Sequence, residues 1–261
     1  MPLSLAFREY GSGPPLVILH GLFGSQRNWQ SMAERLGRHY RVFACDLRNH
    51  GDSPWAPSMR FEEMADDLEA LIEGKGLAPA TVLGHSVGGK TAMLTALRHP
   101  DVVDALIVVD IAPVTYEEPF LAYIAAMQAA DLGPGCRRGD VEAALAAAVP
   151  DTATRLFLLQ NLEEQPAGGG FAWRVNLEAL AANMPALLGF PDTEELAYEG
   201  RALFLSGAAS GYIGRTHQGA VWDRFPQAEF TVIKDAGHYP HVEQPDAFYD
   251  RVTLFLDSAY A

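Results

Sequence analysis

The segment from Thr81 to Arg98 constrains the fold of this chain more than any other. A β-branched apolar run leads directly into Gly-x-Ser-x-Gly around Ser86, and a helix-forming stretch follows at once. A serine held between a strand and a helix by so few residues needs a strained turn. Glycine is required at Gly84 and Gly88, where side chains would collide with neighbouring backbone. This unit predicts an α/β chain that presents Ser86 at one edge of a sheet.

The rest of the chain alternates short apolar runs with amphipathic helical stretches. In residues 61–72, for example, Phe61, Met64 and Leu68 share one helix face while acidic side chains take the other. Strands that alternate with helices predict a mostly parallel sheet covered on both faces. The runs expected as buried strands are Leu16–Leu19, Val42–Cys45, Thr81–Leu83, Leu106–Val109, Ala202–Leu205 and Phe230–Ile233.

The alternation stops between residues 116 and 198, where the chain is rich in Ala and Leu and no strand is expected. We interpret residues 116–198 as a helical cap inserted into a core domain formed by residues 1–115 and 199–261. The chain leaves and re-enters the sheet at strand ends, where ligands bind in such folds. The alternative is a helical subdomain that only adds bulk. Helices are expected at Phe120–Ala130, Val141–Val149, Thr152–Leu162 and Leu177–Met184.

Composition limits the partners. The net charge of −14 would repel the phosphate backbone of a nucleic acid and an anionic membrane surface, so small neutral substrates are expected. No apolar run reaches the ~18 residues that a membrane span needs, and a cytoplasmic location is expected. Cys45 and Cys136 lie in different contexts and are expected to be unpaired. No metal motif occurs, so neither a metal nor a cofactor is expected, and the sequence predicts no oligomeric state.

A serine hydroxyl needs a base to take its proton and an acid to orient that base. His238 is the best-placed histidine, because it follows a predicted strand through a loop that can project its imidazole over the sheet edge. His241 is the competitor. Asp110 ends the strand Leu106–Val109 at the same edge and is the predicted acid, with Asp235, Asp46 or a buried water as alternatives. The predicted catalytic residues are therefore Ser86, Asp110 and His238.

A tetrahedral intermediate also needs hydrogen-bond donors for its oxyanion. The glycine-rich turn from His20 to Ser25 follows the first predicted parallel strand and can aim a main-chain N–H at the site. We expect the amides of Leu22 and Val87 to form the oxyanion hole, with Phe23 as an alternative to Leu22. Because these donors are main-chain groups, substituting either side chain would not remove them.

Several motifs together carry a specific resemblance, namely His20–Ser25, Asp46–Ser53, Gly84–Lys90, Asp110–Pro113, Trp173–Leu177 and Ala236–His238. They resemble the YbfF-type esterases, a bacterial branch of the α/β-hydrolases with a mitochondrial abhydrolase-domain relative in animals. The resemblance implies the α/β-hydrolase fold, with a mostly parallel eight-stranded sheet, flanking helices and an inserted helical cap. It also implies an acid after the sixth strand, which matches Asp110.

The same resemblance implies esterase or thioesterase activity. Family members usually carry Met after the nucleophile, whereas this chain has Val87. The smaller side chain makes the neighbouring pocket wall narrower than it would be with Met. The Arg48-Asn49-His50-Gly51 turn looks like a family signature, which we interpret as scaffolding near the pocket. We expect a mostly apolar pocket of modest size for short to medium acyl chains. The candidates for its walls are Phe23, Met127, Leu159, Trp173, Met184 and Tyr239.

The expected function is that of a serine carboxylesterase for small to medium acyl esters, with thioesters as a further substrate class. An acyl-CoA thioesterase, a cofactor-free perhydrolase or haloperoxidase, and a carbon–carbon bond hydrolase would keep the same three residues. A non-catalytic ligand-binding protein of the same fold is an alternative from another class. The serine, the histidine, the aspartate and the turn from His20 to Ser25, which we call the oxyanion loop, are all present in the sequence. An enzyme is therefore favoured.

Overall fold

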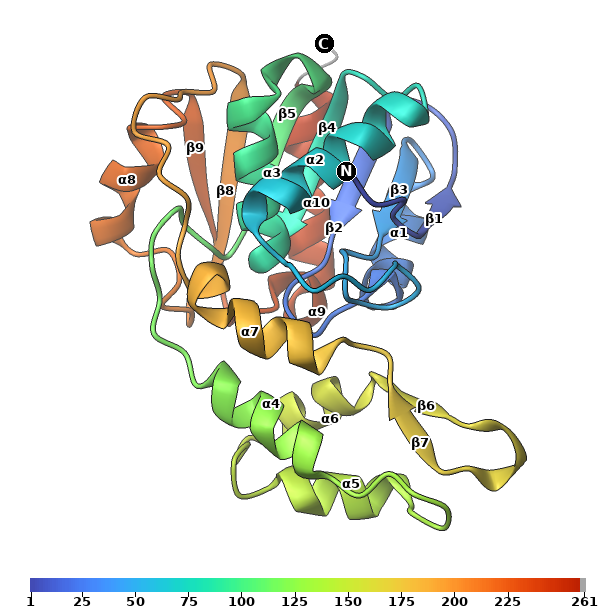
Figure 1. Ribbon diagram of the computed structural model, residues 1–261. Helices are drawn as coiled ribbons and strands as arrows, with labels where there is room; N and C mark the ends of the chain where they lie inside the picture. Colours follow the sequence, from blue (N-terminus) through green and yellow to red (C-terminus); the bar gives the residue numbers. More distant parts are fainter. Residues whose placement is uncertain (259–261) are drawn as a thin grey trace.

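A seven-stranded sheet runs through the computed structural model of the protein, which describes residues 1–258 (Figure 1). The strand order is β1-β3-β2-β4-β5-β8-β9, and only β1 is antiparallel to its neighbour. All six predicted strands are present. The strands are β1 (Phe7–Tyr10), β2 (Pro15–Leu19), β3 (Arg41–Cys45), β4 (Ala80–His85), β5 (Val103–Val109), β8 (Arg201–Gly207) and β9 (Ala228–Ile233).

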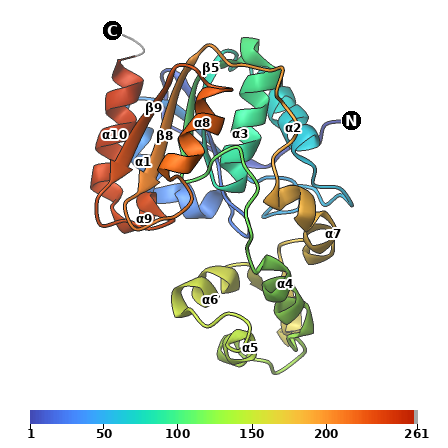
Figure 2. The ribbon, with the colours of Figure 1, turned by 90° about the vertical axis from the view of Figure 1, so that its left-hand side faces the viewer.

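Helices cover both faces of this sheet (Figure 2). In β2, Val17 and Leu19 belong to the apolar core under α2 and α3, whereas Leu16 and Ile18 belong to the core against α1 and α10. Burial on both faces explains why the central strands are nearly continuous apolar runs. The helices are α1 (Gln30–Leu36), α2 (Phe61–Gly74), α3 (Val87–Arg98), α8 (Gln218–Trp222), α9 (Pro240–Glu243) and α10 (Pro245–Asp257), with 3-10 turns at Gln26–Trp29, Pro100–Val102, Pro166–Gly168 and Arg215–His217.

The strand count differs from the expectation of eight, because the sheet in residues 1–258 has seven strands. The residues before β1 do not add an eighth. The amide of Leu3 donates to the carboxylate of Asp67 at 2.6 Å instead of to a neighbouring strand. No helix in the same part of the chain is long and apolar enough to cross a membrane. Both cysteines, Cys45 and Cys136, are free, as predicted.

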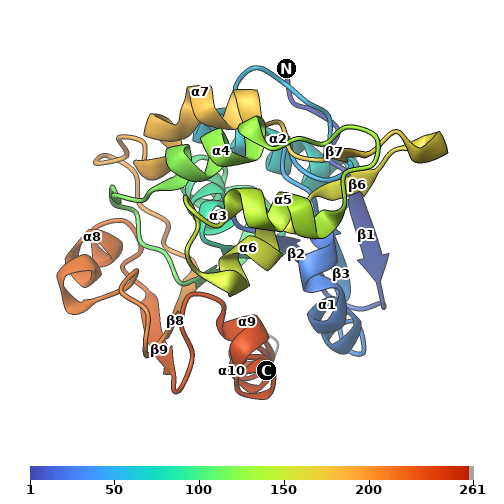
Figure 3. The same cartoon turned by 90° about the horizontal axis from the view of Figure 1, so that it is seen from below.

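The segment between β5 and β8 lies at the carboxyl ends of the parallel strands, below the sheet in Figure 1 and in front of it in Figure 3. The four predicted helices are present. The prediction of no strand in this segment was wrong, because two three-residue strands pair as an antiparallel hairpin. Such short strands give no readable alternation. The elements are α4 (Phe120–Ala129), α5 (Arg138–Leu145), α6 (Thr152–Leu159), β6 (Leu162–Glu164), β7 (Phe171–Trp173) and α7 (Leu177–Leu188).

Both ends of this segment are tied to α3 by the buried side chain of Lys90. Its Nζ donates to the carbonyl of Val114 on the outgoing connection, and to those of Leu188 and Gly189 on the return, at 2.9, 2.9 and 2.5 Å. Burial lowers the pKa of Lys90 to about 7. The amide of Tyr116 also donates to the carbonyl of Leu188, at 3.0 Å. The two connections therefore meet beside the helix that begins immediately after Ser86.

Candidate active site

Ser86 occupies the strained turn that the sequence predicts, between the end of β4 and the start of α3. Its φ of 52° and ψ of −120° are uncommon for a residue other than glycine. A Cβ on Gly84 would lie 2.2 Å from the carbonyl oxygen of Gly88, and a Cβ on Gly88 would lie 2.4 Å from that of His20. Both glycines are therefore required by close backbone approach.

The structure brings His238 and Asp110 together at the same edge of the sheet. Nδ1 of His238, in the loop after β9, lies 2.7 Å from Oδ2 of Asp110, which follows β5 and is fully buried. A carboxylate can only accept here, so Nδ1 carries the proton and Nε2 is the basic nitrogen. The carboxylate is held in turn by the hydroxyl of Ser210 at 2.5 Å and the amide of Gly207 at 3.2 Å.

The alternatives weighed for these roles have other partners. Asp235 has a side chain that is 73% exposed, beside Lys234. Asp46 accepts the amides of Gln26 and Asp52, at 2.7 and 2.9 Å. His241 is buried and stacks on the indole of Trp29, with ring centroids 4.0 Å apart. Burial lowers the pKa of His241 to about 3, which makes it a weak base.

The two amides expected to form an oxyanion hole are both available. Within residues 1–258, neither the Leu22 nor the Val87 amide donates a hydrogen bond to another group of the chain. Val87 is the first residue of α3, where an N–H has no partner within the helix. The alternative donor, the amide of Phe23, already donates to Nε2 of His50 at 3.2 Å. A Cβ on Gly21 would lie 3.1 Å from the Cβ of Ser86, so the loop adjoins the serine.

Three buried histidines surround these groups as neutral hydrogen-bonding residues, as predicted for His20 and His85. Burial lowers the pKa of His20 to about 4 and that of His50 to about 3, and it places that of His85 well below its ordinary value. Nε2 of His20 accepts the amide of Leu47 at 3.0 Å. Nε2–H of His85 donates to the carbonyl of His238 at 2.8 Å, which links the serine turn to the loop of the base.

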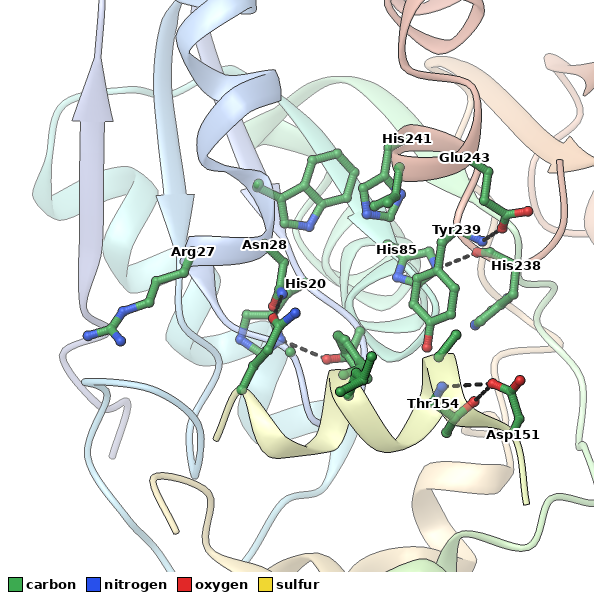
Figure 4. A pocket seen from close by; sticks show the side chains of 18 residues that line it. His20, Arg27, Asn28, His85, Asp151, Thr154, His238, Tyr239, His241 and Glu243 are labelled. Atoms are coloured by element: carbon green, nitrogen blue, oxygen red, sulfur yellow. Dashed lines mark hydrogen bonds between the residues drawn. The ribbon is translucent and has the colours of Figure 1, made fainter. Parts of the chain in front are cut away.

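Two cavities flank the site. A groove of about 850 Å³ lies between α6 and the loops after β2 and β9, and it is lined by His238, Tyr239, Arg27, Asn28 and Thr154 among others (Figure 4). A much smaller cavity, of about 20 Å³, adjoins the serine turn. Its walls are Ser86, Val87, Lys90, Ile111, Tyr116, Glu118, Phe120, Leu187, Leu188 and Tyr212.

Of the six side chains suggested as pocket walls, Tyr239 lines the groove. The others line neither cavity. Met127, Leu159 and Met184 are at most 1% exposed inside the apolar core, and Trp173 donates its Nε1–H to the carbonyl of Met127 at 2.9 Å. Phe23 is buried, with its ring edge-on to that of Phe120. The contacts of Met127, Leu159 and Met184 are those of helix packing, because large apolar side chains at helical spacing bury themselves against neighbouring helices first.

Sequence reasoning missed most of the residues that line the small cavity. Tyr212 stacks on the His238 imidazole with ring centroids 4.1 Å apart, and its hydroxyl donates to Glu118 at 2.5 Å. These residues come from separate connections around the sheet edge, so no local pattern joins them. In residues 1–258, the one cluster able to hold a metal ion is Asp66, Glu69 and His99, which lies on α2 and after α3, outside both cavities.

The fold, with its serine turn between β4 and α3, defines the class of the protein as an α/β hydrolase. The family model for the alpha/beta hydrolase fold matches residues 14–245, and the chain belongs to that family. It is an enzyme of the hydrolase class.

Named relatives lie within the same family. The sn-1-specific diacylglycerol lipase ABHD11 of Mus musculus is 43% identical over 253 residues, 93% of this chain and 81% of that protein. Esterase YbfF of Escherichia coli (strain K12) is 32% identical over 248 residues, 93% of each chain. The solved structure of a marine microorganism esterase matches with a TM-score of 0.93 and 37% identity, covering 97% of this chain and 99% of that one. The resemblance to YbfF-type esterases is thus confirmed.

Proposed function

We propose that the chain is a serine carboxylesterase that hydrolyses small to medium acyl esters through an acyl-enzyme on Ser86. The observation that carries the proposal is the 2.7 Å hydrogen bond from His238 Nδ1 to the buried carboxylate of Asp110, at the sheet edge that also bears the strained serine. The esterases and lipases among the relatives agree with ester hydrolysis.

The chemistry follows from which atoms are free. Nε2 of His238 takes the proton of the Ser86 hydroxyl as its oxygen attacks the ester carbonyl, and Asp110 stabilises the imidazolium that forms. The amides of Leu22 and Val87 hold the oxyanion of the tetrahedral intermediate. Nε2–H then protonates the leaving alcohol as its bond to carbon breaks. A water molecule activated by the same nitrogen finally releases the acid and restores the serine.

The positions of the two cavities suggest which of them receives the alcohol portion of the ester and which receives the acyl portion. The leaving atom receives its proton from His238, so the leaving group lies beside the imidazole. His238 lines the large groove, of about 850 Å³, whereas Ser86 and Val87 line the small cavity, of about 20 Å³. We therefore assign the alcohol portion to the groove and the acyl group to the side of the small cavity. That cavity holds about one water-sized group, so a longer acyl chain requires its walls to move.

The test is a series of p-nitrophenyl esters from acetate to decanoate, assayed with the wild type and with Ser86→Ala. We expect the highest kcat/KM with short to medium chains and almost no turnover by Ser86→Ala. A fluorophosphonate probe should label the wild type and not the variant. Undiminished turnover by Ser86→Ala would end the proposal, and an optimum at long chains would overturn the assigned chain length.

Matched acyl thioesters in the same series decide between the two substrate classes. Esters and thioesters yield the same acyl-enzyme, so a preference must arise from the leaving group and its groove. Higher kcat/KM for the thioester of a given acyl chain would favour a thioesterase. Absence of both turnover and labelling would instead favour a ligand-binding protein.

A further inference from the structure

The oxyanion loop contains one strained residue other than glycine. Phe23 follows Leu22 and has a φ of 60°, in the left-handed region that a bulky side chain rarely adopts. Its side chain is 4% exposed and packs against Phe120. Such a conformation persists only where the surrounding structure holds it. The contacts of the Phe23 main chain are therefore informative.

Both peptide groups of Phe23 are held by side chains from distant parts of the sequence. Its N–H donates to Nε2 of His50, in the turn after β3, at 3.2 Å. Its carbonyl accepts from Nδ2 of Asn161, between α6 and β6, at 2.8 Å. Asn161 is itself buried, and the same Nδ2 reaches the carbonyl of Leu158 at 3.2 Å. One contact thus comes from the sheet domain and the other from the helical segment below it.

The imidazole of His50 is arranged to accept. Its Nδ1 lies 3.0 Å from the carbonyl of Arg48, which can only accept, so Nδ1 carries the proton and Nε2 offers a lone pair. The turn that holds His50 is also joined to the helical segment. The amide of Asn176 donates to the carbonyl of Asn49 at 2.9 Å, and Nδ2 of Asn176 donates to Oδ1 of Asn49 at 3.0 Å. The Arg48–Gly51 turn therefore contacts both the oxyanion loop, through His50, and the helical segment, through Asn49.

We propose that His50 and Asn161 are positioning residues that fix the oxyanion hole by clamping the main chain of Phe23 from both sides. The peptide whose N–H is held by His50 is the one that follows Leu22, so the clamp limits rotation of Leu22 and keeps its own amide directed at the reacting carbonyl. Because Asn161 belongs to the helical segment, the orientation of the Leu22 amide depends on the position of that segment relative to the sheet. The inference rests on the proposed esterase function.

The experiment compares His50→Leu and Asn161→Leu, which remove the acceptor and the donor, with the wild type. We expect kcat to fall by about 10- to 100-fold with little change in KM, because a misdirected donor weakens transition-state binding only. Affinity for a trifluoromethyl ketone, whose adduct with Ser86 bears an oxyanion, should weaken by the same factor. His50→Gln, which can place an acceptor oxygen near the position of Nε2, should recover part of the loss.

Asn183→Leu is the matched control. Nδ2 of Asn183 also joins the helical segment to the main chain of the sheet domain, at the carbonyl of Pro57 and 3.0 Å, but away from the oxyanion loop. It should leave kcat unchanged. Active-site titration with the fluorophosphonate corrects every rate for the folded, competent fraction, so a variant that folds poorly still reports its kcat.

Two results would overturn the clamp. Wild-type kcat and ketone affinity in both leucine variants would show that the hole does not depend on these contacts. An equal loss in Asn183→Leu would show a general effect of the segment. Failure of the esterase function gives a different pattern, because the wild type itself would then neither turn over esters nor react with the fluorophosphonate.

Discussion

The carboxyl edge of the sheet and the helical segment between β5 and β8 face each other across the site, but different interactions hold them. At the sheet edge, buried hydrogen bonds fix the carboxylate of Asp110, which has three donors. The segment is held mainly by apolar packing of residues such as Met127 and Met184. Polar contacts such as those of Asn161 and Lys90 join it to the rest.

This difference indicates that the two regions have different functions. Groups that must be aligned within a fraction of an ångström lie at strand ends or in the loops that directly follow them, and the sheet fixes where these loops begin. Groups that shape the cavities lie largely on connections and helices, where packing tolerates change. Substitutions at the edge should therefore change rate constants. Substitutions in the segment should change selectivity or stability, except at Asn161, whose side chain contacts the main chain of Phe23 beside the oxyanion hole.

The largest expected effect is that of Asp110→Asn. It would disturb the tautomer and charge that the His238 imidazole needs, and kcat should fall by about 10⁴-fold. Asp235→Asn, three residues before the histidine and largely exposed, should leave kcat unchanged. Steady-state kinetics of both variants on p-nitrophenyl acetate checks this. Nearly wild-type kcat in Asp110→Asn would place the acid elsewhere and remove the sheet edge from its role.

Lys90→Met tests the join between the two regions. The substitution leaves the carbonyls of Val114, Leu188 and Gly189 without their buried donor, so the free energy of unfolding should fall by about 2–3 kcal/mol. Urea unfolding measures it. Lys234→Met, at a side chain that is 90% exposed, is the control and should stay within about 0.5 kcal/mol. Equal midpoints for the two variants would mean that Lys90 does not hold the segment.

Leu187→Ala tests whether the segment sets selectivity. Leu187 lines the small cavity, so its truncation should admit longer chains and raise the hexanoate-to-acetate ratio of kcat/KM by about 10-fold, or ~1.4 kcal/mol. Leu156→Ala, in the wall of the groove, should alter alcohol preference without moving that ratio. An opposite pattern, with Leu156 controlling chain length, would exchange the two assigned sides.

The last prediction concerns pH. Burial lowers the pKa of His241 to about 3, whereas an unfolded histidine titrates near 6.5. Between these values the unfolded state binds more protons, so the free energy of unfolding falls as pH decreases, by up to ~1.4 kcal/mol per pH unit for each such histidine. His241→Phe keeps the stacking on Trp29 and removes one group. Its urea-unfolding free energy should decline less steeply from pH 6.5 to 4.5, and an unchanged slope would contradict this assignment.

Local patterns predicted much of the protein. The positions of the central strands follow from continuous apolar runs, because a strand buried on both faces tolerates little else, whereas the half-buried edge strand β1 has no such run and was not predicted. The serine turn is readable because strand, glycines and helix are contiguous in sequence. Asp110 and His238 were predicted because each follows a strand, and the carboxyl ends of parallel strands share one edge of the sheet.

Only the tertiary structure decided contacts between distant segments. It shows that the amide of Leu22 is free to serve as an oxyanion donor, whereas the amide of Phe23 is hydrogen-bonded to His50. It also shows that Met127 and Met184, which were proposed as pocket walls, are buried in the core. Residues from other segments line the two cavities. The physical reason is that periodicity in a sequence shows which face of an element is apolar, whereas the partner of that face depends on how separate elements pack together.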